Sequence, residues 1–298
     1  MTPTLTPTVK AAVLVEALPY IKRFWEQIVV VKYGGNVLSG ADEQTALRLF
    51  AEDVVLMRSV GMRPVVVHGG GPQISEMLGR LGVASEFRNG QRVTDAATLD
   101  VARMVLVGKV NRDIVAAINT HGALAVGMSG EDARLLTVTC RDPTLGFVGD
   151  VASVNTDLIR RLLNDELIPV IATIGADSDG QAYNVNADTA AGAIAGALKA
   201  AKLVYLTNIE GLRRNVDDPK SLISSIGVDE LQSLLDDGTL TEGMIPKIES
   251  CIHAIRAGVA KAHILDGRAE HALLLEIFTR EGIGTEVTSN GSVSERKL

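Results

Sequence analysis

Six short runs of Val, Ile, Leu and Ala recur along this chain of 298 residues, and within them the apolar residues follow one another without alternating with polar ones. A strand with one face in water alternates apolar and polar residues, whereas a strand covered by helices on both faces is apolar throughout. The runs lie at 28–32, 63–68, 123–128, 167–174, 202–207 and 261–266, and helix-length segments separate them at 42–59, 72–81, 95–119, 155–164, 188–200 and 247–257. This alternation predicts an α/β fold of βαβ units, with a mainly parallel central sheet and helices on both faces.

Two stretches depart from this pattern and predict antiparallel hairpins. Residues 87–95, FRNGQRVTD, carry Asn-Gly between β-prone flanks, which is a strong turn signal. Residues 133–154 favour a second hairpin with a longer loop. Insertions of this kind can lie over one edge of a sheet and act as lids. We also expect the chain to divide into two lobes near residue 180, with a cleft between them.

Charge and composition exclude several classes of function. The formal charge is −7, no basic cluster occurs and aromatic residues make up 3% of the chain, so a nucleic-acid partner is not expected. Cys140 and Cys251 are far apart and outside any metal-ligand spacing, which indicates two reduced thiols and no metal site. The first residues lack the charged and apolar regions of a secretory signal, and no apolar run reaches about 18 residues. We therefore expect a cytoplasmic protein without a membrane span.

The segment before the first strand has the pattern of a helix with one apolar face. Leu14, Leu18, Ile21 and Trp25 recur at spacings of four, three and four residues. Pro19 lies inside this segment and is expected to kink the helix. The pattern leaves two interpretations open: the helix packs on its own domain, or it protrudes and pairs with its copy in another subunit.

Glycines gather where the first two predicted strands end. KYGGN at 32–36 follows the first strand, and HGGGP at 68–72 follows the second and leads into a helix. Consecutive glycines let backbone N–H groups approach a ligand closely, and a helix N-terminus adds positive potential. In open parallel sheets, ligands bind beside the carboxyl ends of the strands. Two such clusters at adjacent junctions predict a site for anionic groups, either phosphate or carboxylate.

The usual nucleotide-binding motifs are absent, since the chain contains neither G-x-G-x-x-G nor G-x-x-x-x-G-K-[ST]. This argues against an ordinary dinucleotide-binding dehydrogenase and against a P-loop enzyme, so the anion site needs other cations. Lys32 ends the first strand, Arg92 follows the Asn-Gly turn, and Lys247 lies near the start of a helix. Most lysines and arginines are solvated surface charges. Lys32 is the exception, because the apolar run before it places its backbone in the core.

Polar side chains alternate in the segment YNVNADTAAG. An extended backbone would point Asn184, Asn186 and Asp188 toward one side. Asp188 is also expected to cap the helix of small residues that follows. Two amides and a carboxylate exceed what a cap requires. The pattern leaves open that Asp188 orients lysines and that the asparagines hold a carboxylate or an amide of a substrate.

Several ordered motifs resemble those of the amino-acid kinase family and, within it, of the acetylglutamate kinases. They extend from about Glu16 to Thr285: EALPYI, KYGGN, VVVHGGGPQIS, GQRVTD, MVLVGKVN, YNVNADTAAG, GMIPK, and DGRAEHALLLEIFT followed by GIGT. The resemblance implies an open αβα sandwich with a kinked N-terminal helix at 1–27, a lobe at 28–180 that binds N-acetyl-L-glutamate and a lobe at 181–298 that binds ATP. The implied reaction moves the γ-phosphoryl group of ATP, used with Mg²⁺, to the side-chain carboxylate, and the resulting acyl phosphate serves arginine synthesis.

Matching these motifs residue by residue implies roles for single side chains. Lys32 and Lys247 would stabilise the transferring phosphoryl group, and Asp188 would hold both lysines in place. Acetylglutamate would be bound by Gly70, Gly71, Arg92 and Asn184. The nucleotide would be bound by Gly34, Gly35, Thr207, Asn208 and Gly211. No general base is required, because the acceptor carboxylate is already ionised at neutral pH.

The chain departs from the family pattern at three positions. Asn208 stands where the family usually has Asp, Glu242 where it usually has a second Gly, and Glu131 where Lys is common. Asn208 and Glu242 are expected near the nucleotide, so these two changes bear on the affinity for ATP. The lysines and the aspartate expected to act in catalysis are all present.

The N-terminal helix resembles the extension of the arginine-inhibited, hexameric branch, in which such helices interlace between dimers. That resemblance implies a homohexamer, a trimer of dimers, with L-arginine bound between the helix and the C-terminal segment. The implicated residues are Tyr20, His271, Glu281, Gly282 and Gly284. The sequence leaves open whether a nitrogen-signalling protein also binds.

Two alternatives remain open from the residues alone. An arginine-binding regulatory protein on a kinase scaffold, with a decayed nucleotide site, would have no use for the catalytic charges, so the presence of Lys32, Asp188 and Lys247 favours an enzyme. A relative that phosphorylates another acid or carbamate would keep the same scaffold. Arg92 and Asn184 favour a substrate with two carboxylates and an amide.

Overall fold

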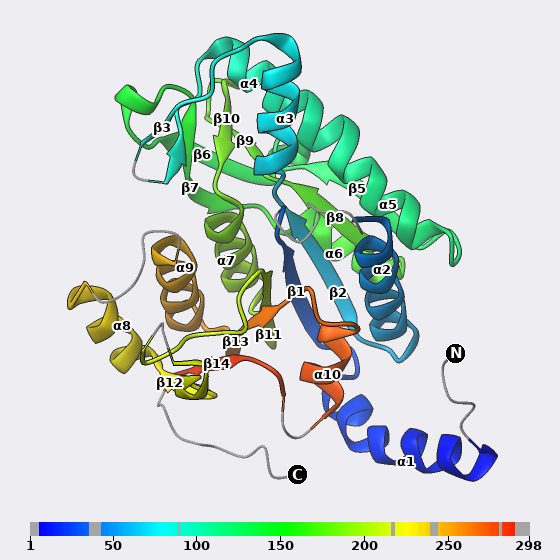
Figure 1. The fold of residues 1–298 in the computed structure, drawn as a ribbon. Helices are drawn as coiled ribbons and strands as arrows, with labels where there is room; N and C mark the ends of the chain where they lie inside the picture. The colour runs from blue at the N-terminus through cyan, green and yellow to red at the C-terminus, as the bar shows by residue number, and fades with distance from the viewer. Residues whose placement is uncertain are drawn as a thin grey trace.

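The computed structural model describes residues 6–35, 43–88, 90–215, 218–238, 244–279 and 282–289. Through this part of the chain runs an eight-stranded sheet in the order β12-β14-β13-β11-β1-β2-β8-β5 (Figure 1). Its strands are β1 (Ile28–Tyr33), β2 (Arg63–His68), β5 (Ala125–Ser129), β8 (Ile168–Ala172), β11 (Lys202–Thr207), β12 (Ser225–Gly227), β13 (Lys261–Asp266) and β14 (Thr285–Thr288). All pairings from β13 to β5 are parallel, and β14 runs antiparallel to β13. The predicted mainly parallel sheet is confirmed.

Helices cover both faces of this sheet. They are α2 (Glu43–Ser59), α3 (Gly71–Leu81), α4 (Ala96–Arg103), α5 (Asn111–Asn119), α6 (Asp157–Asn164), α7 (Ala187–Leu198), α8 (Val228–Asp236), α9 (Ile245–Arg256) and α10 (Ala272–Phe278). Successive residues of a strand point to opposite faces. On β1, Val31 joins an apolar core that contains Phe50 of α2, whereas Val30 joins a second core that contains Ile194 of α7. The two cores on opposite faces confirm the predicted αβα sandwich.

Both predicted hairpins are confirmed. The first is β3 (Phe87–Arg88) with β4 (Gln91–Arg92), and the second is β6 (Leu136–Cys140) with β7 (Val148–Val154). The second hairpin joins β9 (Ile174–Ala176) and β10 (Ala182–Val185) in a small closed barrel. Short 3-10 turns occur at Asp132–Arg134, Pro143–Leu145 and Pro219–Ser221. The strand predicted at 167–174 is therefore divided, because the chain leaves the main sheet after β8 and enters the barrel as β9.

The long helix predicted at 95–119 has a widened turn in its middle. α4 passes into a π-helical segment, Met104–Val110, and then into α5 without leaving helical geometry. Asp95 caps the start, where its carboxylate accepts a hydrogen bond of 2.8 Å from the Thr98 backbone N–H. Segments of this kind are uncommon and occur often at functional sites.

The N-terminal helix, α1 (Pro7–Phe24), contains Pro19 and projects away from the body of the molecule (Figure 1). Leu14 is 70% exposed and Trp25 is 58% exposed, so much of the predicted apolar stripe is uncovered in a single chain. The second half of the helix is the part that packs: Phe24 is buried, Ala17, Tyr20 and Ile21 are partly buried, and α1 contacts α10. Packing of α1 on the rest of the chain thus involves its C-terminal half, whereas its residues before Ala17 are exposed.

A buried polar chain lies beneath the end of α1. The Lys202 ammonium is 3.1 Å from His263 Nε2, and His263 Nδ1 is 2.7 Å from a carboxylate oxygen of Glu276. Burial lowers the pKa of Lys202 to about 8, and burial with the adjacent Lys202 charge lowers the pKa of His263. Burial alone would raise the pKa of Glu276, but the hydrogen bond from His263 and the nearby positive charge lower it to about 2.

The Glu276 carboxylate should make stability depend on pH. Because folding lowers its pKa from 4.5, its contribution is fully present above pH 4.5 and is lost as the pH falls toward 2. We expect Glu276→Gln to flatten this part of the plot of urea unfolding midpoint against pH. Glu230 is half exposed and paired with Arg214 on the surface, so Glu230→Gln serves as the control and should keep the parent profile. A Glu276→Gln profile as steep as that of the parent would contradict the assignment.

Candidate active site

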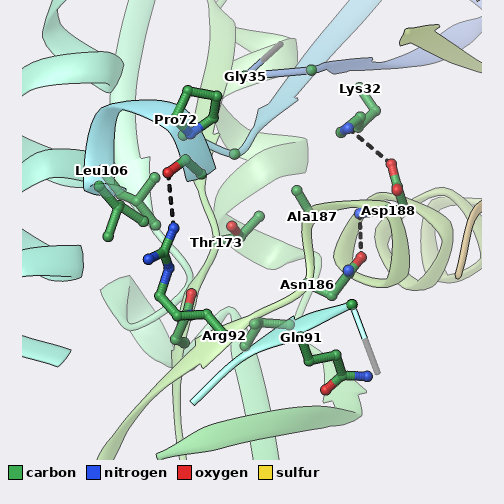
Figure 2. Close-up of a pocket in the computed structure, with 18 of the residues that line it drawn as sticks. Lys32, Gly35, Pro72, Gln91, Arg92, Leu106, Thr173, Asn186, Ala187 and Asp188 are labelled. Atoms are coloured by element: carbon green, nitrogen blue, oxygen red, sulfur yellow. Dashed lines mark hydrogen bonds and ion pairs between the residues drawn. The ribbon is translucent and has the colours of Figure 1, made fainter. Parts of the chain in front are cut away.

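A cleft of about 320 Å³ opens at the carboxyl ends of β1, β2 and β11 (Figure 2). It is lined by both glycine clusters, by residues of the β3–β4 hairpin and by the start of α7. The lining residues are Lys32, Gly34, Gly35, Gly69, Gly70, Gly71, Pro72, Ile74, Phe87, Gly90, Gln91, Arg92, Leu106, Val148, Thr173, Asn184, Val185, Asn186, Ala187, Asp188, Leu206, Thr207, Asn208 and Lys247. Its size and its position beside strand ends are those of a small-molecule site.

Two lysines share one carboxylate in this cleft. The Lys32 ammonium is 2.9 Å from one oxygen of Asp188, and the Lys247 ammonium is 3.0 Å from the other. Three elements supply them: Lys32 comes from β1, Asp188 from the first turn of α7 and Lys247 from the first turn of α9. Burial alone would raise the pKa of Asp188, but the two lysine charges hold it below its ordinary value. Asp188 is therefore ionised, and the cluster carries one net positive charge.

The prediction that Asp188 caps α7 is wrong. Asn186 caps the helix instead: its side-chain oxygen accepts hydrogen bonds from the backbone N–H groups of Asp188, at 2.8 Å, and Thr189, at 3.2 Å. Asn and Asp are about equally good caps, so the sequence did not distinguish them. Because Asn186 takes the capping role, both oxygens of Asp188 are left to bind lysines.

The two glycine clusters lie against each other. A Cβ atom on Gly35 would be 3.0 Å from the Pro72 ring and 3.2 Å from the Gly70 Cα, so a side chain at this position would press tightly on the second glycine turn. Gly71 starts α3. The backbone of both turns can therefore approach a ligand closely at a helix N-terminus, as the sequence predicts.

The guanidinium of Arg92 is held at the wall of the cleft by polar groups of α3. It donates 2.9 Å and 2.7 Å hydrogen bonds to the Gly71 carbonyl and the Ser75 hydroxyl, and it lies 4.6 Å from the centre of the Phe87 ring. The Asn184 amide lies 3.4 Å from the Thr94 hydroxyl on the same side of the cleft. The predicted acceptor-binding residues Gly70, Gly71, Arg92 and Asn184 are thus brought together.

The residues predicted to bind a nucleotide divide into two groups. Thr207 and Asn208 line the cleft together with Gly34 and Gly35. Gly211 is not among the described residues that line it. A side chain on Gly211 would collide with Thr285, and its φ of +150° favours glycine, so its place is set by packing on β14. Glu242 lies outside the described residues, and Glu131 forms a 2.9 Å ion pair with Arg103.

The described residues among those predicted to bind arginine do not line the cleft. The His271 ring is 2.6 Å from a carboxylate oxygen of Asp53, whose pKa burial raises to about 6 even though the hydrogen bond from His271 lowers it. Tyr20 lies on α1, partly exposed. Gly282 has a φ of +60°, and a side chain on Gly284 would collide with the Ile264 carbonyl. Glu281 lies outside the described residues.

Several residues that line the cleft were not singled out from the sequence, Leu106 and Thr173 among them. Leu106 lies in the π-helical segment, and Thr173 follows β8. The only sequence signal for Leu106 was the motif MVLVGKVN, which carries the resemblance but has no obvious ligand-binding residue.

Other features bear on metal binding, membranes and thiols. Within the described ranges, no three His, Cys, Asp or Glu side chains gather closely enough to hold a metal ion. No helix found there has both the length and the hydropathy needed to cross a bilayer. Cys140 is exposed and Cys251 is buried, both as free thiols.

Comparison with known sequences identifies relatives of high similarity. The model of the amino acid kinase family matches residues 27–266. The acetylglutamate kinase of Symbiobacterium thermophilum is 51% identical over 287 residues, which cover 93% of this chain and 97% of that one. The acetylglutamate kinase of Saccharopolyspora erythraea is 52% identical over 294 residues, with 96% and 95% covered.

Solved structures with the same fold include two enzymes. N-acetylglutamate synthase from Neisseria gonorrhoeae, complexed with coenzyme A and N-acetyl-glutamate, superposes with a TM-score of 0.82 at 29% identity; the match covers 93% of this chain but only 63% of that longer one. Carbamate kinase from Giardia lamblia, bound to AMP-PNP, gives a TM-score of 0.70 at 16% identity over 89% of this chain and 99% of that one, a likeness of fold alone.

The chain therefore belongs to the amino acid kinase family. Within that family it groups with the acetylglutamate kinases, and it is an enzyme, a phosphotransferase whose acceptor is a carboxyl group.

Proposed function

We propose that this protein transfers the γ-phosphoryl group of ATP to the side-chain carboxylate of N-acetyl-L-glutamate, in the cytoplasm, as the second step of arginine biosynthesis. The product is N-acetyl-L-glutamyl 5-phosphate. The observation that carries the proposal is the cluster of Lys32, Asp188 and Lys247, which lies in one cleft with two glycine turns and Arg92. The choice of acceptor is supported by two relatives named acetylglutamate kinase, which are 51% and 52% identical to this chain.

The chemistry asks for charge neutralisation more than for covalent help. The attacking carboxylate and the γ-phosphate are both anions, so they repel each other until cations lie between them. Lys32 and Lys247 reach the cleft from different elements and are held 2.9 and 3.0 Å from one carboxylate, so their positions are fixed before substrates bind. In this mechanism Asp188 orients the two ammonium groups, which stabilise the charge on the transferring group.

The acceptor and the nucleotide take opposite ends of the cleft in this proposal. Acetylglutamate contacts Gly70, Gly71, Arg92 and Asn184, which belong to the lobe 28–180 or border it. ATP contacts Gly34, Gly35, Thr207 and Asn208 and lies on the lobe 181–298. Gly211 would contact the nucleotide through its backbone alone, because a side chain there would collide with Thr285.

Magnesium enters this reaction as the Mg–ATP complex. Asp188 is the one carboxylate among the described residues that line the cleft, and both of its oxygens are occupied by lysines. The described residues therefore offer no dedicated ligand set, and the metal is part of the co-substrate. Mg²⁺ bound to phosphate oxygens neutralises part of their charge.

ADP release with Mg–ATP and N-acetyl-L-glutamate tests the proposed activity, with L-glutamate and L-aspartate as controls. We expect turnover with the acetylated substrate only. Equal turnover with another acid would favour the alternative of a relative with a different acceptor. Absence of turnover despite binding of acetylglutamate would favour the regulatory protein with a decayed nucleotide site, and Asn208→Asp would be the reversion to make.

Arg92→Lys should raise the KM for acetylglutamate about tenfold or more and leave the KM for ATP nearly unchanged. The planar guanidinium already spans Gly71 and Ser75 and presents a fixed face to the cleft, which a flexible ammonium cannot reproduce. Steady-state kinetics with each substrate varied in turn measures both constants. Arg141 pairs with Asp150 on the barrel surface, so Arg141→Lys is a matched control. Equal rises in both KM values would contradict the assignment of Arg92 to the acceptor.

We also propose feedback inhibition by L-arginine and a homohexamer formed as a trimer of dimers. The support is the uncovered apolar stripe of α1, which a second copy of the helix would bury, and the contact of α1 with α10 beside His271. In this proposal arginine binds beside the contact of α1 with α10, where it would meet Tyr20, Gly282 and Gly284.

Deletion of residues 1–26 should yield an active dimer that arginine no longer inhibits. The deletion removes the exposed stripe that includes Leu14 and Trp25, and it leaves every residue of the cleft in place. Size-exclusion chromatography with light scattering reports the mass, and ADP release with and without arginine reports inhibition. The full chain is the control, and a truncated protein that stays hexameric and arginine-sensitive would refute both proposals.

A further inference from the structure

The π-helical segment between α4 and α5 packs against the glycine turn of the cleft. A Cβ atom on Gly70 would lie 2.8 Å from the Leu106 side chain and 3.1 Å from that of Val110. The backbone N–H of Asn111 donates to the carbonyl of Leu106, five residues earlier. In an α-helix, a residue five positions on is rotated by about 140°, whereas the wider π turn brings it close to the same face. The widened turn therefore presents Asn111 beside Leu106, toward the glycine turn.

Asn111 is fully buried, and its neighbours determine the orientation of its amide. The nitrogen donates a 2.9 Å hydrogen bond to the Val170 carbonyl, and the oxygen accepts a hydrogen bond from Arg112. The reverse orientation would place oxygen against oxygen at Val170 and nitrogen against nitrogen at Arg112. The same nitrogen lies 3.0 Å from Nε2 of His68 and 3.4 Å from the Met128 carbonyl, so Asn111 presents its second N–H group to the nearer acceptor, Nε2.

His68 is the last residue of β2 and has no exposed surface. Since Nε2 accepts from Asn111, the ring proton must be on Nδ1, which lies 3.1 Å from the Gly69 carbonyl and donates to it. Burial lowers the pKa of His68 to about 4, and the charge of Arg112 acts in the same direction, so the ring is neutral near pH 7. The Gly69 carbonyl thus has a fixed direction.

That direction fixes the next amide group as well. Every described peptide bond is trans, so the N–H of Gly70 points opposite to the carbonyl of Gly69 across the same peptide plane. The carbonyl is turned toward the imidazole, and Gly70 itself lines the cleft.

We propose that Asn111 is a positioning residue for the acceptor site: it holds His68 as the neutral Nδ1–H tautomer, and His68 holds the Gly69–Gly70 peptide with the Gly70 N–H directed to the acceptor carboxylate. The inference rests on the proposed function for the identity of the acceptor. The tautomer of His68 and its dependence on Asn111 do not rest on the proposed function. Neither residue touches substrate, so both act through the glycine turn.

The direct test is the tautomer of His68, read from long-range ¹H–¹⁵N correlations of the histidine rings in the full-length protein. The parent should show a protonated Nδ1 and an unprotonated Nε2. Asn111→Asp offers only acceptor oxygens, so it should move a proton to Nε2. The same variant should raise the KM for acetylglutamate about tenfold, since the direction of one buried hydrogen-bond donor is lost, with the KM for ATP little changed. Asn111→Leu adds no acceptor, so the proton should stay on Nδ1, but the ring loses the group that fixes it at Nε2 and the same KM should rise by less than in Asn111→Asp.

Asn119, at the other end of α5, provides the matched control. Its side chain accepts hydrogen bonds from the backbone of Leu124 and Ala125, far along the helix from the cleft. Asn119→Leu should lower the melting temperature while leaving the His68 tautomer and the KM for acetylglutamate as in the parent. If Asn119→Leu raises the KM for acetylglutamate as much as Asn111→Leu does, then Asn111 has only a structural role.

Each result distinguishes this inference from the proposed function. A protonated Nε2 in the parent overturns the inference even if the Asn111 variants fail to fold. A proton moved to Nε2 in Asn111→Asp with an unchanged acceptor KM overturns it too. Failure of the parent to bind acetylglutamate in calorimetry overturns the proposed function alone, because the tautomer and its response to Asn111→Asp are still measured in the ligand-free protein.

Discussion

Lys32→Ala is expected to lower kcat by about 100- to 1,000-fold and to change both KM values far less. The Lys32 side chain is only 9% exposed and its ammonium lies 2.9 Å from Asp188, so the cation is fixed in a site that holds little water. A fixed cation stabilises the charge that moves during transfer more than it stabilises bound substrates. Steady-state kinetics with saturating Mg–ATP and acetylglutamate measures the effect.

An exposed lysine serves as the control for this variant. Lys109 is half exposed and pairs with Asp113 on the surface of the π-helical segment, so Lys109→Ala should keep the parent kcat. A Lys32→Ala enzyme that retains more than about a tenth of the parent kcat would contradict a direct role of this ammonium in phosphoryl transfer.

Asp188→Asn is expected to lower both kcat and the free energy of unfolding. The amide leaves two ammonium groups without their counter-charge, and removing one member of a buried ion pair costs about 3–5 kcal/mol. Mg–ATP should restore part of this loss, because its phosphates bring negative charge to the same lysines. Urea unfolding with and without Mg–ATP measures the stability, and ADP release measures kcat.

A second substitution identifies the cause of the destabilisation. Adding Lys32→Met to Asp188→Asn removes one of the uncompensated charges, so the double variant should unfold at a higher urea concentration than Asp188→Asn alone. Asp113→Asn breaks an exposed pair and should cost less than about 0.5 kcal/mol. If Asp188→Asn unfolds at the parent's urea concentration, the lysines do not depend on this carboxylate.

The continuous apolar runs were sufficient to predict the parallel sheet and most of its helices. Val29, Val30 and Val31 form an unbroken apolar run that predicts a strand covered on both faces, and all three are fully buried in the structure. Lys32 follows them directly, which places it near the carboxyl end of that strand. The glycine turns were equally readable, because they stand at the junctions where parallel strands meet helices. The hairpin at 87–95 followed from its Asn-Gly turn.

Other parts of the fold had no local signal. The strands β12 and β14 have three and four residues, and α10 has seven, so each is too short to show a periodic pattern. The assignment of the cap at α7 needed the positions of two lysines that are distant in sequence. Through a π turn Leu106 comes to line the cleft and Asn111 comes to contact His68 behind it, and composition does not reveal such a turn in advance.

The place of β1 in the sheet has a consequence for the order of folding. It pairs with β2 on one edge and with β11 on the other, and Val29 lies opposite Lys202. One edge of this largely apolar strand therefore stays open until the ribosome has made almost 70% of the chain. An unpaired apolar edge is a template for association with other chains, and pairing between distant segments is slow. The nascent chain is thus most prone to aggregate before β11 emerges, and the segment that ends with β8 cannot complete its sheet pairing until β11 has been made.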